Sequence, residues 1–463
     1  MSLYDQLEPH VQELSQNPPP ELVACERLIG NPFHVQALWP TNMHTYLLLA
    51  RSFLSAPLCD LGLSNISVDF RRHIMALTSL VAECPSCALG IVSMKSQGTA
   101  NLRLVDQVSS SESGKSSPFK EGEKYALNAI VSATKLPARR GERARVNLVK
   151  YYGETGLQKI ALICGYLGFT NTIGELLCLP VDMQALSRAT STSLAGTGFT
   201  VAETRVKDLA SAAPRKGSIA NVVQVFAKTE QLLRGFPFSN AQLNTWMQTR
   251  FGFVPRYMLK MQTGGAKRSL CRVWSMGFFM DDPEGQQPNI PFPDKIVLGI
   301  LFFRSTQNSY LLTHFTHLAH AQSVSVQTVQ NALAVSKQNV VEVIKDKIAF
   351  EQLSQLLACK IAIRDCEHYR LSSRLLEAAE GNVSRVMELV NLMGIYALMQ
   401  RYTAVFDDAS GLEQECEAAV ETDVGKALGL ANLTPYTANS EAAAQLNSGS
   451  PSAAAIWGGG VTF

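Results

Sequence analysis

The sequence lacks the features that mark membrane, nucleic-acid-binding and secreted proteins. Its 41 basic and 39 acidic residues leave a formal charge of +2, so no charge excess favours nucleic acid or an anionic membrane as a partner. The longest strongly apolar run, residues 296–303, is far shorter than the roughly 20 residues that a membrane-spanning helix needs. The N-terminal segment shows no charged stretch followed by an apolar one, so we expect no secretory signal.

Disulfide and metal frameworks are also missing. The ten cysteines are scattered without the regular spacing of a disulfide-stapled domain, which indicates free thiols in a reducing compartment, and we expect a cytoplasmic protein. No second CxxC motif or histidine pair lies at structural-zinc spacing, so neither a metal ion nor another cofactor is predicted. Alternating apolar and polar residues, the signature of half-buried strands, are rare as well.

Apolar residues at helical spacing dominate what is present, and we predict an all-α fold. A chain of 463 residues is too long for one ordinary core. We expect a helical domain over 1–182, a connector with short helices over 183–292, a second helical domain over 293–407, and a low-complexity tail over 408–463. The serine-rich loop at 109–117 and the tail segment 439–455 are predicted to be the first sites of limited proteolysis.

The motif Cys84-Pro-Ser-Cys87 is the sharpest chemical feature, and it follows an apolar helical segment. Two thiols one helical turn apart can close into a disulfide, one attacking a substrate as thiolate and the other resolving the product. The motif alone is a weak signal, since two cysteines that merely pack in a core give the same pattern.

The context of the motif resembles the alkylhydroperoxidase D-like family, which includes the carboxymuconolactone decarboxylases. An apolar helix enters the CxxC, and a short helix, a turn and a long apolar helix over 148–182 look like that family's last helices. The resemblance covers about 45–182, and a weaker copy covers 293–407. In that second copy the cysteine positions are expected at Gln307 and Tyr310, so it has no dithiol.

The resemblance implies a role for each thiol. In that family the second cysteine is the peroxidatic one, so Cys87 would attack a hydroperoxide and Cys84 would resolve the product. The chain departs from the family's proton relay: the two histidine positions and the glutamate position hold other residues, namely Ser86, Ile91 and Arg72.

His73 is the candidate that replaces the missing relay. It lies eleven residues before Cys84, about three helical turns, so both side chains can share one helix face, with Asp69 one turn earlier. A single histidine on such a helix is more often a packing residue.

Three further histidines recur at intervals of three in the second copy, at 314, 317 and 320. Successive side chains at this spacing turn by about 60° around the helix, so all three do not easily bind one ion. We interpret them as a half-buried polar seam between the two domains.

The leading hypothesis is therefore a thiol-dependent oxidoreductase that reduces a small hydroperoxide or disulfide through Cys84 and Cys87, with a thiol protein as reductant. The layout of two related helical halves also resembles that of the sestrins, which implies a binding or regulatory protein without catalysis. A cofactor-free decarboxylase is the third alternative, although no general base stands out. We expect a monomer or a homodimer.

Overall fold

The computed structural model describes residues 1–29, 34–53, 66–93, 119–136, 142–184, 186–187, 201–207, 219–261, 264–281, 287–406 and 412–432. The serine-rich loop 109–117 and the tail segment 439–455, for which proteolysis is predicted, lie outside the described residues. The predicted all-α fold is confirmed. Among the described residues the only sheet is a pair of two-residue parallel strands, β1 and β2, paired through Val181 and Val206.

The first part of the chain forms helices α1 (Leu3–Gln16), α2 (Pro20–Ile29), η1 (His34–Leu38), α3 (Pro40–Phe53), α4 (Val68–Val81), α5 (Pro85–Ser93), α7 (Glu121–Thr134) and α8 (Glu142–Leu177). Strand β1 (Val181–Asp182), helix η3 (Glu203–Arg205) and strand β2 (Val206–Lys207) follow. Side-chain caps begin several helices: Ser2 and Ser67 each accept a backbone N–H of the first turn. Helix α8 is broken at Gly153, whose φ of 67° lies in the left-handed region.

The second part contains helices α10 (Ile219–Leu233), α11 (Asn240–Phe251), α12 (Arg256–Leu259), α13 (Gly264–Gly277), α14 (Phe292–Ser305), α15 (Ser309–Ala321), α16 (Val326–Val335), α17 (Val340–Val343) and α18 (Phe350–Ala362). It ends with α19 (His368–Ser372), α20 (Leu375–Ala378), α21 (Val383–Phe406), α22 (Gln414–Glu417), η4 (Ala418–Glu421), α23 (Asp423–Leu428) and η5 (Leu430–Asn432). Residues 412–432 are thus mostly helical and packed, where the sequence predicts a low-complexity tail from 408 onward.

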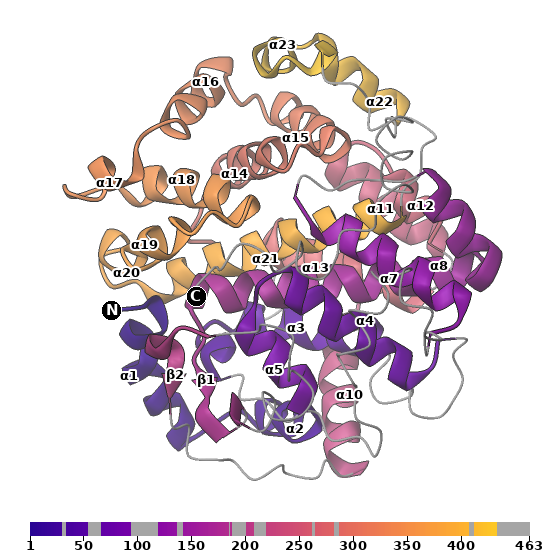
Figure 1. Cartoon of the computed structure of the whole chain (residues 1–463). Coiled ribbons are helices and arrows are strands. Elements are labelled where there is room, and N and C mark those ends of the chain that lie inside the picture. The colour runs from indigo at the N-terminus through magenta and orange to yellow at the C-terminus, as the bar shows by residue number, and fades with distance from the viewer. Residues whose placement is uncertain are drawn as a thin grey trace, which may run out of the picture.

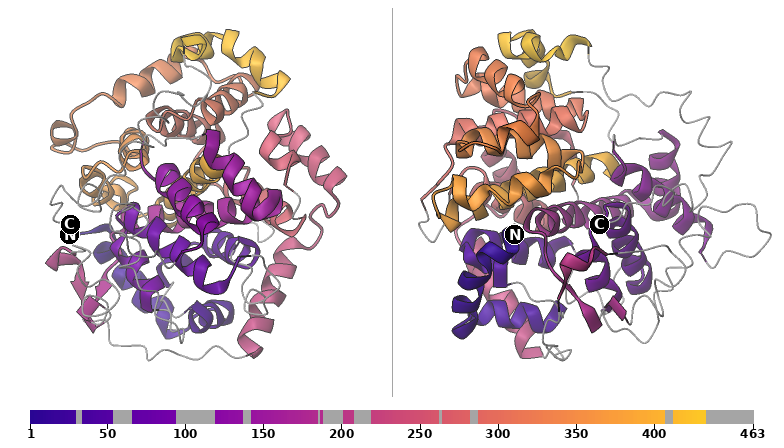
Figure 2. Two further views of the ribbon diagram at one scale, coloured as in Figure 1. Left: turned by 45° about the vertical axis from the view of Figure 1, so that its right-hand side comes forward. Right: turned by 60° about the vertical axis from the view of Figure 1, so that its left-hand side comes forward.

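Helices α8 and α21 form the centre of the molecule (Figure 1). The two helices run antiparallel and lie very close to each other, because glycines at the crossing place no side chain between them. A Cβ at Gly168 would lie 2.4 Å from the carbonyl oxygen of Ala397, and one at Gly394 would lie 2.7 Å from the Phe169 ring. In Figure 2 the helices of the first part lie on one side of this pair and α14–α20 on the other.

Helix boundaries repeat along the chain at a nearly constant interval. The starts of α3 and α13, of α4 and α14, and of α5 and α15 are each 224 residues apart: Pro40 and Gly264, Val68 and Phe292, Pro85 and Ser309. The part of α8 beyond its break, 154–177, and α21 are both 24 residues long, with starts 229 residues apart. We infer an internal repeat whose second copy includes α13, a helix that lies within the predicted connector.

Within the described residues one helical stretch, Arg145–Leu177, is long and apolar enough to cross a bilayer, although its most apolar window is 94% buried inside the protein. Core helices of proteins without membrane spans have the same composition, so this stretch is weak evidence for a membrane span.

Candidate dithiol site

A tight turn between α4 and α5 positions the two cysteines of the motif. Glu83 takes a left-handed conformation with φ of 57°, and the N–H of Cys84 donates to the carbonyl of Ser79, which closes the end of α4. Pro85 then starts α5, where its missing N–H costs no hydrogen bond. Cys84 therefore precedes the first turn of α5, and Cys87 lies within that turn.

Both thiols face one point on the surface of α8. A Cβ built on Gly174 would lie 3.0 Å from the Cys84 Sγ and 3.2 Å from the Cys87 Sγ, so any larger residue would require the sulfurs to shift. The Cys84 Sγ also lies 3.6 Å from the Ser86 hydroxyl, and the Cys87 Sγ lies 3.7 Å from the carbonyl oxygen of Thr170. The two cysteines are free thiols in this conformation.

The thiols differ in their exposure. Cys84 is 1% exposed, whereas Cys87 is half-buried. Burial raises the pKa of Cys84 well above its usual value, and its neighbours Cys87 and Glu175 raise it further, while Arg205 acts in the opposite direction. Cys84 is thus held as a neutral thiol, and Cys87 is the more accessible sulfur.

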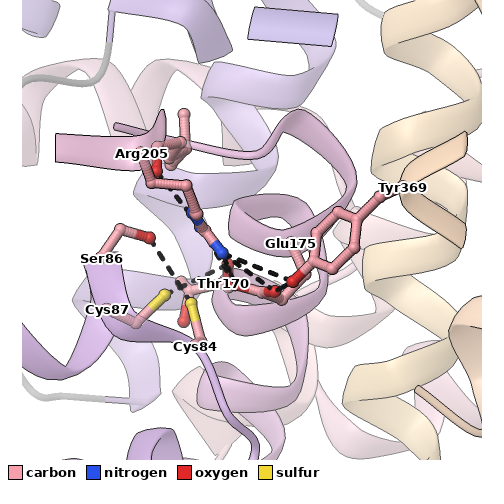
Figure 3. A network of polar contacts seen from close by, with 8 residues as sticks. Cys84, Ser86, Cys87, Thr170, Glu175, Arg205 and Tyr369 are labelled. Atoms are coloured by element: carbon pink, nitrogen blue, oxygen red, sulfur yellow. Dashed lines mark hydrogen bonds and ion pairs between the residues drawn. The ribbon is translucent and has the colours of Figure 1, made fainter. Parts of the chain in front are cut away.

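A buried carboxylate, Glu175, adjoins the dithiol (Figure 3). Arg205 donates to both of its oxygens at 3.3 Å, and the Tyr369 hydroxyl donates to its Oε2. Burial raises the pKa of Glu175, against the lowering effects of Arg205, of the Tyr369 hydroxyl and of a hydrogen bond with Cys84. A carboxyl group with a raised pKa beside a thiol is suited to accept and return a proton.

Two more arginines, the half-buried Arg364 and the buried Arg401, add positive charge around the site. Arg364 donates to the carbonyls of Val81 and Thr134, at the ends of α4 and α7. Arg401 on α21 is buried, which lowers its pKa to about 9, and it interacts electrostatically with Cys84 and Cys87. Positive charge at this range favours the thiolate form of a cysteine.

His73, the relay candidate predicted from the sequence, makes its contacts elsewhere. Its Nδ1 lies 2.8 Å from the carbonyl oxygen of Asp69, and its ring meets the edge of Phe119 at 5.2 Å between centroids. Neither Asp69 nor Phe119 contacts the two thiols. The other two predicted site residues, Cys84 and Cys87, do lie together.

The turn between α14 and α15 repeats the cysteine turn without the thiols. Gln307 has the same φ of 57° as Glu83, and the N–H of Asn308 bonds to Phe303 as that of Cys84 bonds to Ser79. The sequence predicts that Gln307 and Tyr310 correspond to Cys84 and Cys87. The structure shifts this correspondence by one residue. The positions of the cysteines are held by Asn308 and Leu311, whose sequence neighbours resemble the first copy too weakly to fix the register.

Asn308 takes part in a buried amide network in place of a thiol. Its Nδ2 donates to the Gln400 Oε1 at 2.7 Å and to the Thr403 hydroxyl at 3.3 Å. Thr403 lies 229 residues after Gly174, which is the interval between α8 and α21. In the second copy the side chain of Thr403 thus occupies the space that, in the first copy, Gly174 leaves open to the two sulfurs.

The sequence prediction missed five groups around the dithiol. They are Glu175 on α8 and, from three other parts of the chain, Arg205, the pair Arg364 and Tyr369, and Arg401. Glu175 alone carries a recognisable signal, because it is the only acidic residue in the apolar stretch 157–177.

Comparisons with known proteins add no relative: no family model matches the chain, and no curated protein or solved structure is significantly similar to it.

Proposed function

We propose that the protein is a thiol-dependent oxidoreductase in which Cys84 and Cys87 alternate between dithiol and disulfide. The observation that carries the proposal is the convergence of both sulfurs on Gly174, within 3.2 Å of one point. A disulfide requires two sulfurs that can approach to about 2.05 Å, and neighbouring thiols that share one open space satisfy this with small side-chain rotations. The buried Glu175 and the surrounding arginines supply proton transfer and positive charge at the same place.

The difference in exposure supports a separate role for each thiol. Cys87, the accessible sulfur, attacks the terminal oxygen of a hydroperoxide as thiolate, which forms an S–O bond, breaks the O–O bond and releases an alcohol after protonation. Cys84 then loses its proton to Glu175 and attacks the sulfenic acid on Cys87. This second step forms the disulfide and releases water.

The cycle needs a small hydroperoxide or disulfide as oxidant and a thiol protein that returns two electrons and two protons to the disulfide. A reducing compartment such as the cytoplasm supplies such a protein. The half-buried Cys87 is the sulfur that the reductant attacks. The protein carries out this cycle as a monomer or a homodimer.

The test is hydroperoxide consumption by the full chain, with cumene hydroperoxide as oxidant and dithiothreitol as reductant. Cys87→Ser is expected to abolish turnover. Cys84→Ser is expected to stop after one oxidation and to leave a sulfenic acid on Cys87, detected by mass spectrometry of its dimedone adduct. Cys366→Ser removes an exposed cysteine that lies outside the motif and serves as the matched control, with turnover equal to that of wild type.

A sestrin-like binding protein is the second candidate, and the burial of Cys84 with its raised pKa favours it, because inert structural thiols have these properties. Equal hydroperoxide consumption by all three variants and wild type, with no Cys84–Cys87 disulfide after oxidation, would make this candidate the better one.

A further inference from the structure

A second cluster of reactive side chains lies in the other half of the molecule, where α15 meets α22. A ring nitrogen of His314, a carboxylate oxygen of Glu413 and the Sγ of Cys416 all lie within 4.8 Å of one another. The exposed fractions of these residues are 4%, 6% and 0%. Nitrogen, oxygen and sulfur donors are thus gathered in a space that bulk water hardly reaches.

The neighbours of Glu413 orient its carboxylate. Its Oε1 accepts hydrogen bonds from the Tyr310 hydroxyl at 2.7 Å and from the backbone N–H of Arg256 at 2.6 Å. Its Oε2 is left facing the His314 Nε2, at 2.7 Å. Partners of this kind fix the carboxylates that bind metal ions, because they hold the carboxylate in one orientation.

The third donor comes from the same helical turn. Glu413 is the residue before α22, and Cys416 lies three residues later, so both side chains project from one face of that turn. The backbone of this segment is held by His317, whose Nδ1 lies 3.1 Å from the carbonyl oxygen of Glu415. The three donors therefore come from two elements that are fixed against each other.

We propose that His314, Glu413 and Cys416 bind one zinc ion, with a solvent molecule as the fourth ligand. Zinc accepts nitrogen, oxygen and thiolate donors together, at about 2.0–2.3 Å and in tetrahedral geometry, whereas magnesium and calcium require oxygen donors. A carboxylate and a thiolate balance the two charges of the ion, and the thiol proton passes to solvent on binding. To reach tetrahedral separations the His314 nitrogen and the Glu413 oxygen, now 2.7 Å apart, would open to about 3.3 Å, and the longest separation, at most 4.8 Å, would close by about 1 Å.

Such a site would attach the C-terminal helices α22 and α23 to α15. The sequence predicts no metal because no second CxxC motif or histidine pair lies at structural-zinc spacing, and of the histidines at 314, 317 and 320, which do not easily bind one ion together, only His314 takes part. Its partners lie about 100 residues later, at a distance that no short metal-binding motif covers.

The experiment uses the full chain with Cys84→Ser and Cys87→Ser, so that the CxxC motif cannot bind metal and the result does not depend on the proposed oxidoreductase. Titration with zinc against a chromogenic chelator is expected to give one equivalent. His314→Ala and Cys416→Ser should each weaken binding by at least about 100-fold, since even loss of a group that only orients a ligand costs 10–100-fold. His320→Ala, exposed on the same helix, is the matched control and should bind as the parent does.

Cobalt provides a second readout, which is positive in the parent protein itself. The parent protein with one equivalent of Co²⁺ should show the near-ultraviolet charge-transfer band of a cobalt–thiolate bond, and this band should vanish in Cys416→Ser. Absence of the band in the parent, or zinc affinity in Cys416→Ser equal to that of the parent, would overturn the proposal. The cluster would then be a hydrogen-bonded clamp on α22 and nothing more.

Discussion

Gly174 is the residue on which the geometry of the dithiol depends. A methyl group there would lie 3.0 and 3.2 Å from the two sulfurs, closer than ordinary van der Waals contact. We expect Gly174→Ala to push the thiols off their shared site and to slow disulfide formation by oxidised dithiothreitol roughly tenfold, which corresponds to about 1.4 kcal/mol. Gly265→Ala, on a helix with open space around it, should leave the rate unchanged. An unaltered rate in Gly174→Ala would show that the sulfurs reach each other by another path.

His368 is a residue whose titration should be visible in the stability of the protein. Burial lowers its pKa from 6.5 to about 4, and Arg205 acts in the same direction, while its hydrogen bond with the Asp365 carbonyl opposes the shift. Between pH 6.5 and 4 the unfolded chain therefore binds a proton that the folded protein does not. Stability falls as the pH is lowered through this range, by up to about 3 kcal/mol.

The measurement for this pH effect is the urea unfolding midpoint from pH 7 to 4. His368→Gln should flatten the dependence, because glutamine does not titrate. The exposed His320 offers the control, since His320→Gln should retain the wild-type slope. If the urea midpoint changed with pH equally in wild type and His368→Gln, another titrating group would dominate the pH dependence of stability.

The sequence predicts which segments form helices, but it does not predict which helices pack against each other. The spacing of apolar residues predicts the all-α fold, and the CxxC motif predicts which sulfurs meet. The charges around them come from three distant parts of the chain, and no local pattern brings Arg205 or Tyr369 to Glu175. The role of His73 stays a prediction: helical periodicity favours the cysteine side, whereas its contacts are with Asp69 and Phe119, and the tight turn at Glu83 redirects the chain before the cysteines.

The close crossing of α8 and α21 depends on Gly168. A Cβ at Gly168 would come within 2.4 Å of the Ala397 carbonyl, an atom of the backbone that cannot rotate away. We expect Gly168→Ala to separate the helices and to cost about 1–3 kcal/mol, although alanine is the better helix former. The readout is the thermal midpoint, which should fall. Gly265→Ala, with free space around it, should raise it slightly. A higher midpoint for Gly168→Ala would contradict the close crossing.

At the scale of the molecule, the candidate site belongs to both copies of the repeat. The sulfurs and Glu175 come from the first copy, Arg205 from the segment between the copies, and Tyr369 and Arg401 from the second. The pairing of Arg205 with Glu175 is buried, so removal of either side would leave an uncompensated charge at a cost of about 3–5 kcal/mol. The candidate site therefore depends on residues from both halves of the chain.

This interdependence predicts that residues 1–187 do not fold as a monomer when expressed alone. The fragment would expose the face of α8 that packs on α21, in a helix whose most apolar window is 94% buried in the intact protein, and each large apolar side chain exposed costs about 1.5–3 kcal/mol. It would also leave Glu175 buried without Arg205. Sedimentation should show aggregates or self-associated species, and co-expression with residues 201–463 should restore a soluble complex that forms the Cys84–Cys87 disulfide. A fragment that is monomeric, melts cooperatively and closes the disulfide at the wild-type rate would show that the first copy is an independent domain.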